Sequence, residues 1–302
     1  RPMQSKISLG TVQFGLRYGI ANRKGKIPPK EVFEILKYAA DSGINCLDTA
    51  FAYGDSEDVI GAYLRRYPHQ FQVVSKLPSL DVYSLGKAEE CLRVTLGRLN
   101  IKKLSGYLIH SFEDFLVYED LWGELICLKK QGLIDKIGFS LYSPNDLEIL
   151  FKKNIAFDLV QVPYSIFDRR FEKYFDILRR ERVEIHARSV FLQGLVFLNP
   201  DDLPGHFLKA RKQINDLCNL SRDNNISISA LCLNFALLNN CIDKVVIGVD
   251  RLSHLEGNIQ NLRLFVKVSD LKHEFDNLII NEENILLPSQ WRLEDKKDSN
   301  ER

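Results

Sequence analysis

Short apolar segments alternate with segments of helical length along almost the whole chain. Eight apolar segments have the length of buried parallel strands and end in small or polar residues: Ile7–Gln13, Ile44–Asp48, Gln72–Lys76, Gly106–His110, Ile134–Ser140, Asp158–Val162, Val183–Arg188 and Lys244–Gly248. The clearest amphipathic helical segments are Pro29–Ser42, Ser56–Arg66, Ser84–Leu99, Leu121–Gln131, Pro144–Lys153, Phe171–Glu181, Phe207–Asn224 and Leu252–Phe265. The alternation predicts an α/β protein, and eight strand–helix units favour a closed (β/α)8 TIM barrel over an open doubly wound sheet.

Helix boundary residues agree with this prediction. Pro144 directly after Ser143 is a helix start signal, and Gly43 and Gly132 stand where a left-handed residue ends a helix. No Gly-x-Gly-x-x-Gly motif follows the first strand, so the Rossmann signature is absent. Because barrels of this type reach 302 residues as one unit, we expect a single domain over residues 1–302.

A few segments depart from the repeat. Gln193–Gly205 is rich in Gly, Pro, Asn and Asp, and is long enough to be a functional loop. The pattern of Asp270–Asn277 indicates a helix, whereas the charged tail Asp295–Arg302 is typical of a frayed terminus. Tyr18–Pro28 has the composition of a flap.

Charge and cysteine usage narrow the class of partner. The formal net charge is +1, which predicts no nucleic-acid or membrane-surface partner. No stretch approaches the roughly 20 apolar residues of a membrane span, and no signal peptide is evident. The six cysteines form no CxxC pair and no Cys/His group with zinc-ligand spacing. We therefore expect reduced thiols, no metal and a cytoplasmic protein of unknown oligomeric state.

Chemically capable residues follow three consecutive predicted strands. The second strand ends at Asp48 with Tyr53 shortly after, the third ends at Lys76, and the fourth ends at His110. Active sites of such barrels form at the carboxyl ends of the strands, so these side chains should meet. Each residue alone has a structural interpretation, as a turn cap, a packed ring, a surface charge or a core histidine. Their joint occurrence favours a catalytic set.

This set suits reduction of a carbonyl group, which needs hydride at carbon and a proton at oxygen. Tyrosine, with a pKa of about 10, is a weak acid, and a neighbouring Lys⁺ stabilises its phenolate and brings the pKa toward the operating range. Asp48 would keep Lys76 charged and in place. His110 would orient the substrate oxygen, and donors aimed at the developing alkoxide would stabilise the transition state.

The run from Leu47 to Glu57, closed by Gly61, resembles the signature of aldo-keto reductases. The resemblance extends from Leu9 to Asn258. It implies an NAD(P)H-dependent carbonyl reductase or alcohol dehydrogenase on a (β/α)8 barrel. It also implies that Tyr53 is the general acid, supported by Asp48, Lys76 and His110, and that the substrate is a small carbonyl compound.

The resemblance also implies a set of cofactor-binding positions. They are Gly10, Thr11, Ser140, Gln161, Arg188, Ser189, Gln193, Gly194, Gly248, Arg251 and Asn258. Ser140 matches a serine that binds the nicotinamide amide, and Gln161 matches a glutamine beneath the ring. Ser189, Gln193 and Gly194 match the loop on the pyrophosphate side of the cofactor. Arg251 suits the 2′-phosphate of NADPH and Asp250 opposes it, so NADPH is favoured with NADH left open. A helix that starts near Leu252 would offer its N-terminus to phosphate.

Three positions depart from the family pattern: Leu141 replaces Asn, Arg188 replaces an aromatic that stacks on nicotinamide, and Gly257 replaces Glu. They keep open a second hypothesis, a cofactor-sensing or scaffold protein on the same barrel. A metal-dependent hydrolase or isomerase using Asp48 and His110 is a third. An aromatic rim favours a small aldehyde or a sugar-like substrate: Phe14, Tyr18, Phe51, Leu77, Phe112, Tyr142 and Tyr164.

Overall fold

The structure, a computed structural model, describes residues 3–18 and 25–291, where eight parallel strands close into a barrel. They are β1 (Ile7–Gly10), β2 (Cys46–Asp48), β3 (Gln72–Leu77), β4 (Leu104–Ile109), β5 (Ile134–Ser140), β6 (Leu159–Pro163), β7 (Glu184–Arg188) and β8 (Lys244–Gly248). Each strand pairs with the next, and β8 closes the barrel by pairing Gly248 with Gly10. The predicted (β/α)8 barrel is confirmed.

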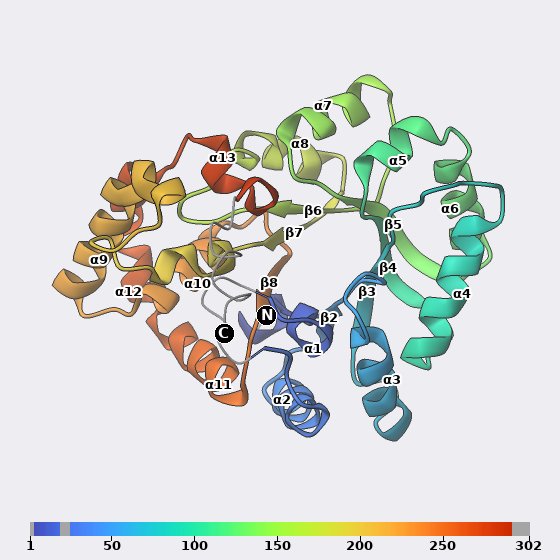
Figure 1. Cartoon of the computed structure of the whole chain (residues 1–302), viewed down its shortest axis with the longest axis horizontal. Coiled ribbons are helices and arrows are strands. Elements are labelled where there is room, and N and C mark those ends of the chain that lie inside the picture. The colour runs from blue at the N-terminus through green and yellow to red at the C-terminus, as the bar shows by residue number, and fades with distance from the viewer. Residues whose placement is uncertain (1–2, 19–24, 292–302) are drawn as a thin grey trace, which may run out of the picture.

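Helices surround the strands on the outside of the barrel (Figure 1). They are α1 (Val12–Gly15), α2 (Pro29–Asp41), α3 (Ser56–Arg66), α4 (Lys87–Leu99), α5 (Phe112–Val117), α6 (Leu121–Lys130), α7 (Pro144–Lys152), α8 (Phe175–Arg180), α9 (Arg211–Asn224), α10 (Ile228–Leu238), α11 (Leu252–Asn261), α12 (Phe265–Ser269) and α13 (Glu283–Leu286). Short 3-10 helices cover Met3–Lys6, Glu172–Tyr174, Leu192–Phe197, Gly205–Ala210, Leu262–Leu264, Lys272–Leu278 and Pro288–Gln290. Within the described ranges, every helix is too short or too polar to cross a bilayer.

Several predicted boundaries were wrong. The first strand ends at Gly10 rather than Gln13, because Thr11 bonds across to the Asp48 carbonyl and the chain then coils into α1. The fourth strand ends at Ile109, so His110 is the first residue of the loop that follows. The predicted functional loop Gln193–Gly205 overlaps the 3-10 segment Leu192–Phe197.

Other helical segments also differ from prediction. Phe171–Glu181, Phe207–Asn224 and Leu252–Phe265 are each split into a 3-10 segment and α-helices. Helix α10 was not predicted because nearly all its side chains are buried, so its sequence has no polar face. The sequence expectations for 295–302, and for most of the Tyr18–Pro28 flap, lie outside the described residues.

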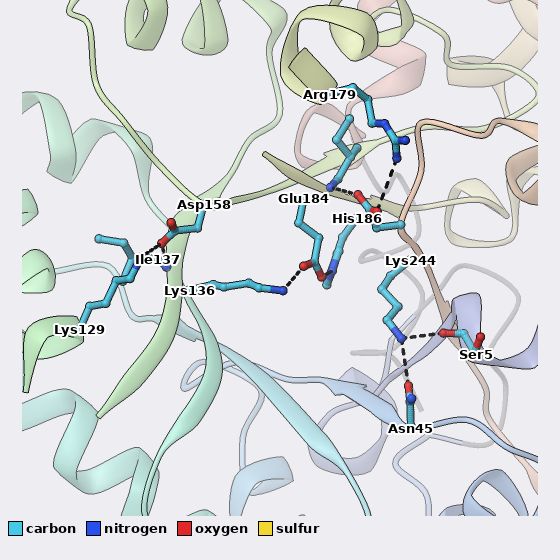
Figure 2. A network of polar contacts seen from close by, with 12 residues as sticks. Ser5, Asn45, Lys129, Lys136, Ile137, Asp158, Arg179, Glu184, His186 and Lys244 are labelled. Atoms are coloured by element: carbon cyan, nitrogen blue, oxygen red, sulfur yellow. Dashed lines mark hydrogen bonds and ion pairs between the residues drawn. The ribbon is translucent and has the colours of Figure 1, made fainter. Parts of the chain in front are cut away.

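The amino ends of the strands form a face crossed by ion pairs (Figure 2). Glu184 at the start of β7 bonds His186 at 2.7 Å and also pairs with Lys136 of β5. Burial alone would raise the pKa of Glu184, but these two partners lower it to about 2. The contact between His186 and Glu184 lies at the face opposite the candidate site, where side chains usually contribute to stability.

Close backbone contacts fix the helices against one another. A Cβ on Gly61 of α3 would lie 1.8 Å from the Arg98 carbonyl oxygen of α4. Glu57, one turn earlier, is buried and accepts hydrogen bonds from Ser75 at 2.8 Å and Thr95 at 3.2 Å. Gly61 and Glu57 of the sequence run that contains Tyr53 therefore join α3 to β3 and α4.

We expect Gly61→Ala to destabilise the fold by about 1–3 kcal/mol, because the added methyl must push two helices apart. Gly97→Ala in α4 is the matched control: no described atom lies within 4 Å of the methyl that alanine would add, so helix propensity should raise stability by about 0.5–1 kcal/mol. Urea unfolding measures both. If the two substitutions changed the free energy of unfolding by the same amount, the close contact at Gly61 would be contradicted.

Candidate active site

The carboxyl ends of β2, β3 and β4 bring the predicted residues together. Asp48 is the last residue of β2, Lys76 lies near the end of β3, and His110 follows β4. Tyr53 lies in the turn between β2 and α3, and its ring centroid is 5.1 Å from Lys76 Nζ and 6.2 Å from the His110 ring. All four side chains therefore face one mouth of the barrel.

Asp48 and Lys76 form a buried ion pair. Lys76 Nζ donates to Asp48 Oδ1 at 2.7 Å and to the Thr49 carbonyl at 2.8 Å, and both side chains are almost inaccessible to solvent. Burial opposes the charge on Lys76, but Asp48 and Tyr53 more than offset it and raise the pKa of this amine. Lys76 therefore stays charged at neutral pH.

Gln161 of β6 completes the bonding of Asp48. Its Nε2 donates to Asp48 Oδ2 at 2.6 Å, so each carboxylate oxygen has a separate donor. The sequence resemblance places Gln161 only beneath the nicotinamide ring. Its bond to Asp48 links strands far apart in sequence, and no local sequence signal indicates it.

Tyr53 keeps its proton at neutral pH. Burial raises the pKa of Tyr53, and the opposing effect of Lys76 is smaller, so the pKa lies above its ordinary value. This differs from the expectation that Lys76 brings the phenol toward the operating range. Lys76 limits the upward shift in the pKa of Tyr53. The phenol therefore stays protonated and keeps a proton that it can donate to a substrate oxygen.

The turn that carries Tyr53 is positioned by α1, a short helix that the sequence does not predict. A Cβ on Gly15 would lie 1.7 Å from the Tyr53 carbonyl oxygen, so only glycine permits this contact. Gly54 has φ +57°, and Ser56 Oγ bonds Thr11 Oγ1 at 2.9 Å. Thr11, predicted as a cofactor contact, thus also holds the start of α3.

His110 is neutral in this site. Burial, with the charges of Lys76 and Arg188, lowers the pKa of His110 to about 4. An imidazole of this kind can donate one hydrogen bond and accept another without carrying charge. It suits orientation of a substrate oxygen better than donation of a proton from imidazolium.

Two predicted cofactor positions lie on the neighbouring strand ends. Ser140 ends β5 and is paired in register with Gln161 of β6, while Arg188 ends β7. The Ser140 hydroxyl is buried and has no hydrogen-bond partner within the described ranges. A buried hydroxyl left this way fits a ligand amide, as expected for a nicotinamide carboxamide.

The loop after β7 has an unusual backbone. Ser189, Leu192, Gln193 and Gly194 all have positive φ, at 59°, 45°, 50° and 96°. Left-handed residues in such close succession turn amide groups toward one side, which makes an anion-binding concavity. Strained backbone of this kind gathers at functional loops, and it fits the predicted pyrophosphate contact at Ser189, Gln193 and Gly194.

In the segment after β8, the basic side chains of Arg251 and His254 both contact a carboxylate. Arg251 pairs with Asp250 at 3.2 Å, and His254 contacts the same carboxylate at 2.7 Å. The Leu252 amide at the start of α11 donates to Glu31 of α2 at 3.1 Å. Asn258 is buried on α11 and Gly248 ends β8.

The predicted aromatic rim is only partly present. Phe14, Leu77 and Tyr164 are buried in the core, which corrects their assignment to the rim. Tyr18 and Tyr142 are exposed. Phe51 packs beneath Arg98 on the α4 side, and Phe112 stacks with other rings around β5. Most of these side chains therefore pack in the core or against neighbouring residues rather than at the mouth of the barrel.

Removing one partner of the buried pair should be costly. We expect Lys76→Met to destabilise the protein by about 3–5 kcal/mol, because Asp48 would keep a buried charge without its counterion. Adding Asp48→Asn to Lys76→Met should restore part of this loss. Urea unfolding of the single and double variants tests it; additive losses in the double variant would contradict the coupling.

The pKa of His110 gives stability a defined pH dependence. An unfolded histidine has a pKa of about 6.5, so between there and about 4 the unfolded chain binds a proton that the folded site rejects. The free energy of unfolding should therefore fall, relative to His110→Asn, as the pH drops through this window. Thermal unfolding at a series of pH values tests this, and parallel curves would contradict it.

Sequence comparison matches this chain to a known protein family. The sequence profile of the aldo/keto reductase family matches residues 6–278. The chain is 26% identical over 284 residues to the uncharacterized oxidoreductase YqkF of Bacillus subtilis, which covers 85% of this chain and 86% of that protein. It is 24% identical over 269 residues to the aldo-keto reductase yakc [NADP(+)] of Schizosaccharomyces pombe, covering 78% of each.

A solved structure shares the fold. The aldo-keto reductase AKR11C1 from Bacillus halodurans, in its holo form, has a TM-score of 0.72 to this chain at 19% identity. The match covers 92% of this chain and 94% of that one. The family profile spans most of the length, including the strand ends that carry Asp48, Lys76 and His110. The chain belongs to the aldo/keto reductase family of oxidoreductases.

Proposed function

We propose that this protein reduces an aldehyde or ketone to an alcohol at the expense of NADPH or NADH, with Tyr53 as general acid. The observation that carries the proposal is the protonated Tyr53 phenol beside the Lys76 ammonium and the His110 ring at one barrel mouth. When bound, the dihydronicotinamide supplies the hydride. The chain's own residues bind the carbonyl oxygen and give it a proton.

The proton moves from Tyr53 Oη to the carbonyl oxygen as negative charge develops there. Lys76 stabilises the phenolate that remains, and Asp48 with Gln161 fixes the position of Lys76. His110, being neutral, donates a hydrogen bond to the same oxygen and orients the carbonyl. A low-dielectric mouth strengthens each of these interactions.

Several residues would hold the nicotinamide cofactor. The Ser140 hydroxyl, which no described residue hydrogen-bonds, fits the carboxamide, and the left-handed loop at Ser189, Gln193 and Gly194 fits the pyrophosphate. Gly10, Thr11 and Gly248 line the β1–β8 side, with Asn258 on α11. We propose this set as the binding path across the carboxyl ends of β1, β5, β7 and β8.

One observation favours binding of NADPH, which carries a 2′-phosphate, and another favours NADH, which lacks it. The relative yakc carries NADP(+) in its name, which supports NADPH. Asp250 beside Arg251, and Glu31 on the Leu252 amide, place two carboxylates where a phosphate would be repelled. Titration of NADPH and NADH in parallel measures the balance directly.

The substrate class follows from the few exposed rings at the mouth. Tyr18 and Tyr142 offer flat apolar faces with hydroxyl groups, which suit a small aldehyde or one face of a sugar. Most other predicted rim residues are core, so a large apolar ligand has little surface to contact here.

Tyr53→Phe removes the donated proton and should lower kcat by roughly 10²–10⁴-fold, with the dissociation constant of the cofactor unchanged. Tyr63→Phe is the matched control: it also removes a phenol hydroxyl, bonded to Gln70 at 2.6 Å on α3, away from the mouth. Its turnover should stay normal. Undiminished turnover by Tyr53→Phe would refute the assignment.

A further inference from the structure

Arg188 carries a positive charge at the mouth that no carboxylate of the described residues pairs with. It is half-buried at the end of β7, its guanidinium carbon lies 4.0 Å from the centroid of the Tyr142 ring, and one Nη donates to the Leu141 carbonyl. Within residues 3–18 and 25–291 it has no carboxylate partner, and its Nε is buried without a hydrogen bond. These contacts fix the side chain in place without neutralising it.

The charge of Arg188 reaches the reacting groups. It opposes protonation of His110, whose pKa is lowered, and it opposes the upward shift in the pKa of Tyr53. The one carboxylate among the reacting residues, Asp48, is already paired with Lys76. Among the reacting residues and Arg188, the charge of Arg188 is therefore the one left without a counterion.

The two redox states of a nicotinamide differ by one positive charge on the ring. A ring that delivers hydride to a carbonyl held by Tyr53 must lie within a few ångströms of that phenol, and so within the field of Arg188. The pyrophosphate is the same in both states, so its attraction to basic groups cancels when they are compared. What remains is repulsion between the Arg188 guanidinium and the cationic ring.

We propose that Arg188 makes the site discriminate between cofactor redox states, holding the reduced form more tightly than the oxidised form. The inference rests on the proposed function, because it needs a nicotinamide at this mouth. Weaker binding of the oxidised form speeds its release after each turnover. The planar guanidinium can still lie against the neutral reduced ring.

The test is the ratio of two dissociation constants, oxidised over reduced, measured without any carbonyl substrate. Protein fluorescence quenching gives both constants, for whichever of the phosphorylated or unphosphorylated cofactor pairs binds. For the wild type the ratio should exceed one. Arg188→Gln should lower it by about tenfold, the scale expected for loss of one partly screened charge. Higher salt should shrink the wild-type ratio and leave that of Arg188→Gln nearly constant.

Arg188→Lys is the matched control because it keeps the charge and loses the planar group. Its ratio should stay near the wild-type value, and Arg188→Met, a second neutral variant, should behave like Arg188→Gln. Equal ratios in the wild type and both neutral variants would overturn the inference while leaving the proposed function intact. A ratio for Arg188→Lys as low as that for Arg188→Gln would show that the effect depends on the shape of the guanidinium rather than on its charge, and it would also overturn the inference. A wild type that binds neither redox form would overturn the proposed function itself.

Discussion

The buried ion pair between Lys76 and Asp48 is the contact on which the whole mouth depends. It joins β3 to β2, and Gln161 extends it across the barrel to β6. A lone buried charge would be driven to neutralise, and Asp48 keeps the buried Lys76 charged by raising the pKa of its amine. The charged Lys76 then acts on Tyr53 and His110 in the same direction: it opposes protonation of both, favouring phenolate and disfavouring imidazolium. The pair therefore acts, together with burial, on the pKa of both groups that would contact a substrate oxygen.

The closed barrel supplies the rigid frame for these charges. Parallel strands place all their carboxyl ends on one face, so residues distant in sequence meet there without long loops. On the opposite face, the ion pair Lys136–Glu184 joins β5 to β7, and Lys129–Asp158 joins α6 to the residue before β6 (Figure 2). Glycines at Gly61 and Gly15 let α3 and the Tyr53 turn approach their neighbours closely. The reacting groups thus lie at the carboxyl ends of the strands, whereas these stabilising ion pairs lie at the amino ends.

Local sequence patterns predicted most of this fold and the grouping of the reacting residues. Strands are short apolar runs with polar ends, and Asp48, Lys76 and His110 mark those ends, so their convergence follows from the barrel alone. Helix α10 escaped prediction because burial on all sides leaves no amphipathic period. The Gln161–Asp48 bond and the approach of Gly15 to Tyr53 depend on tertiary distances that no nearby residue reveals. Similarly, burial outweighs Lys76 in the pKa of Tyr53, a balance that needs the packed structure.

The central claim is that a nicotinamide cofactor and a carbonyl react at this mouth. The most direct measurement is oxidation of NADPH or NADH, followed by absorbance, by the purified protein with a panel of small aldehydes, ketones and open-chain sugars. The account predicts multiple turnovers with at least one of these carbonyls and none without a carbonyl. Cofactor binding with no turnover across the panel would contradict carbonyl reduction and favour a protein that senses the cofactor.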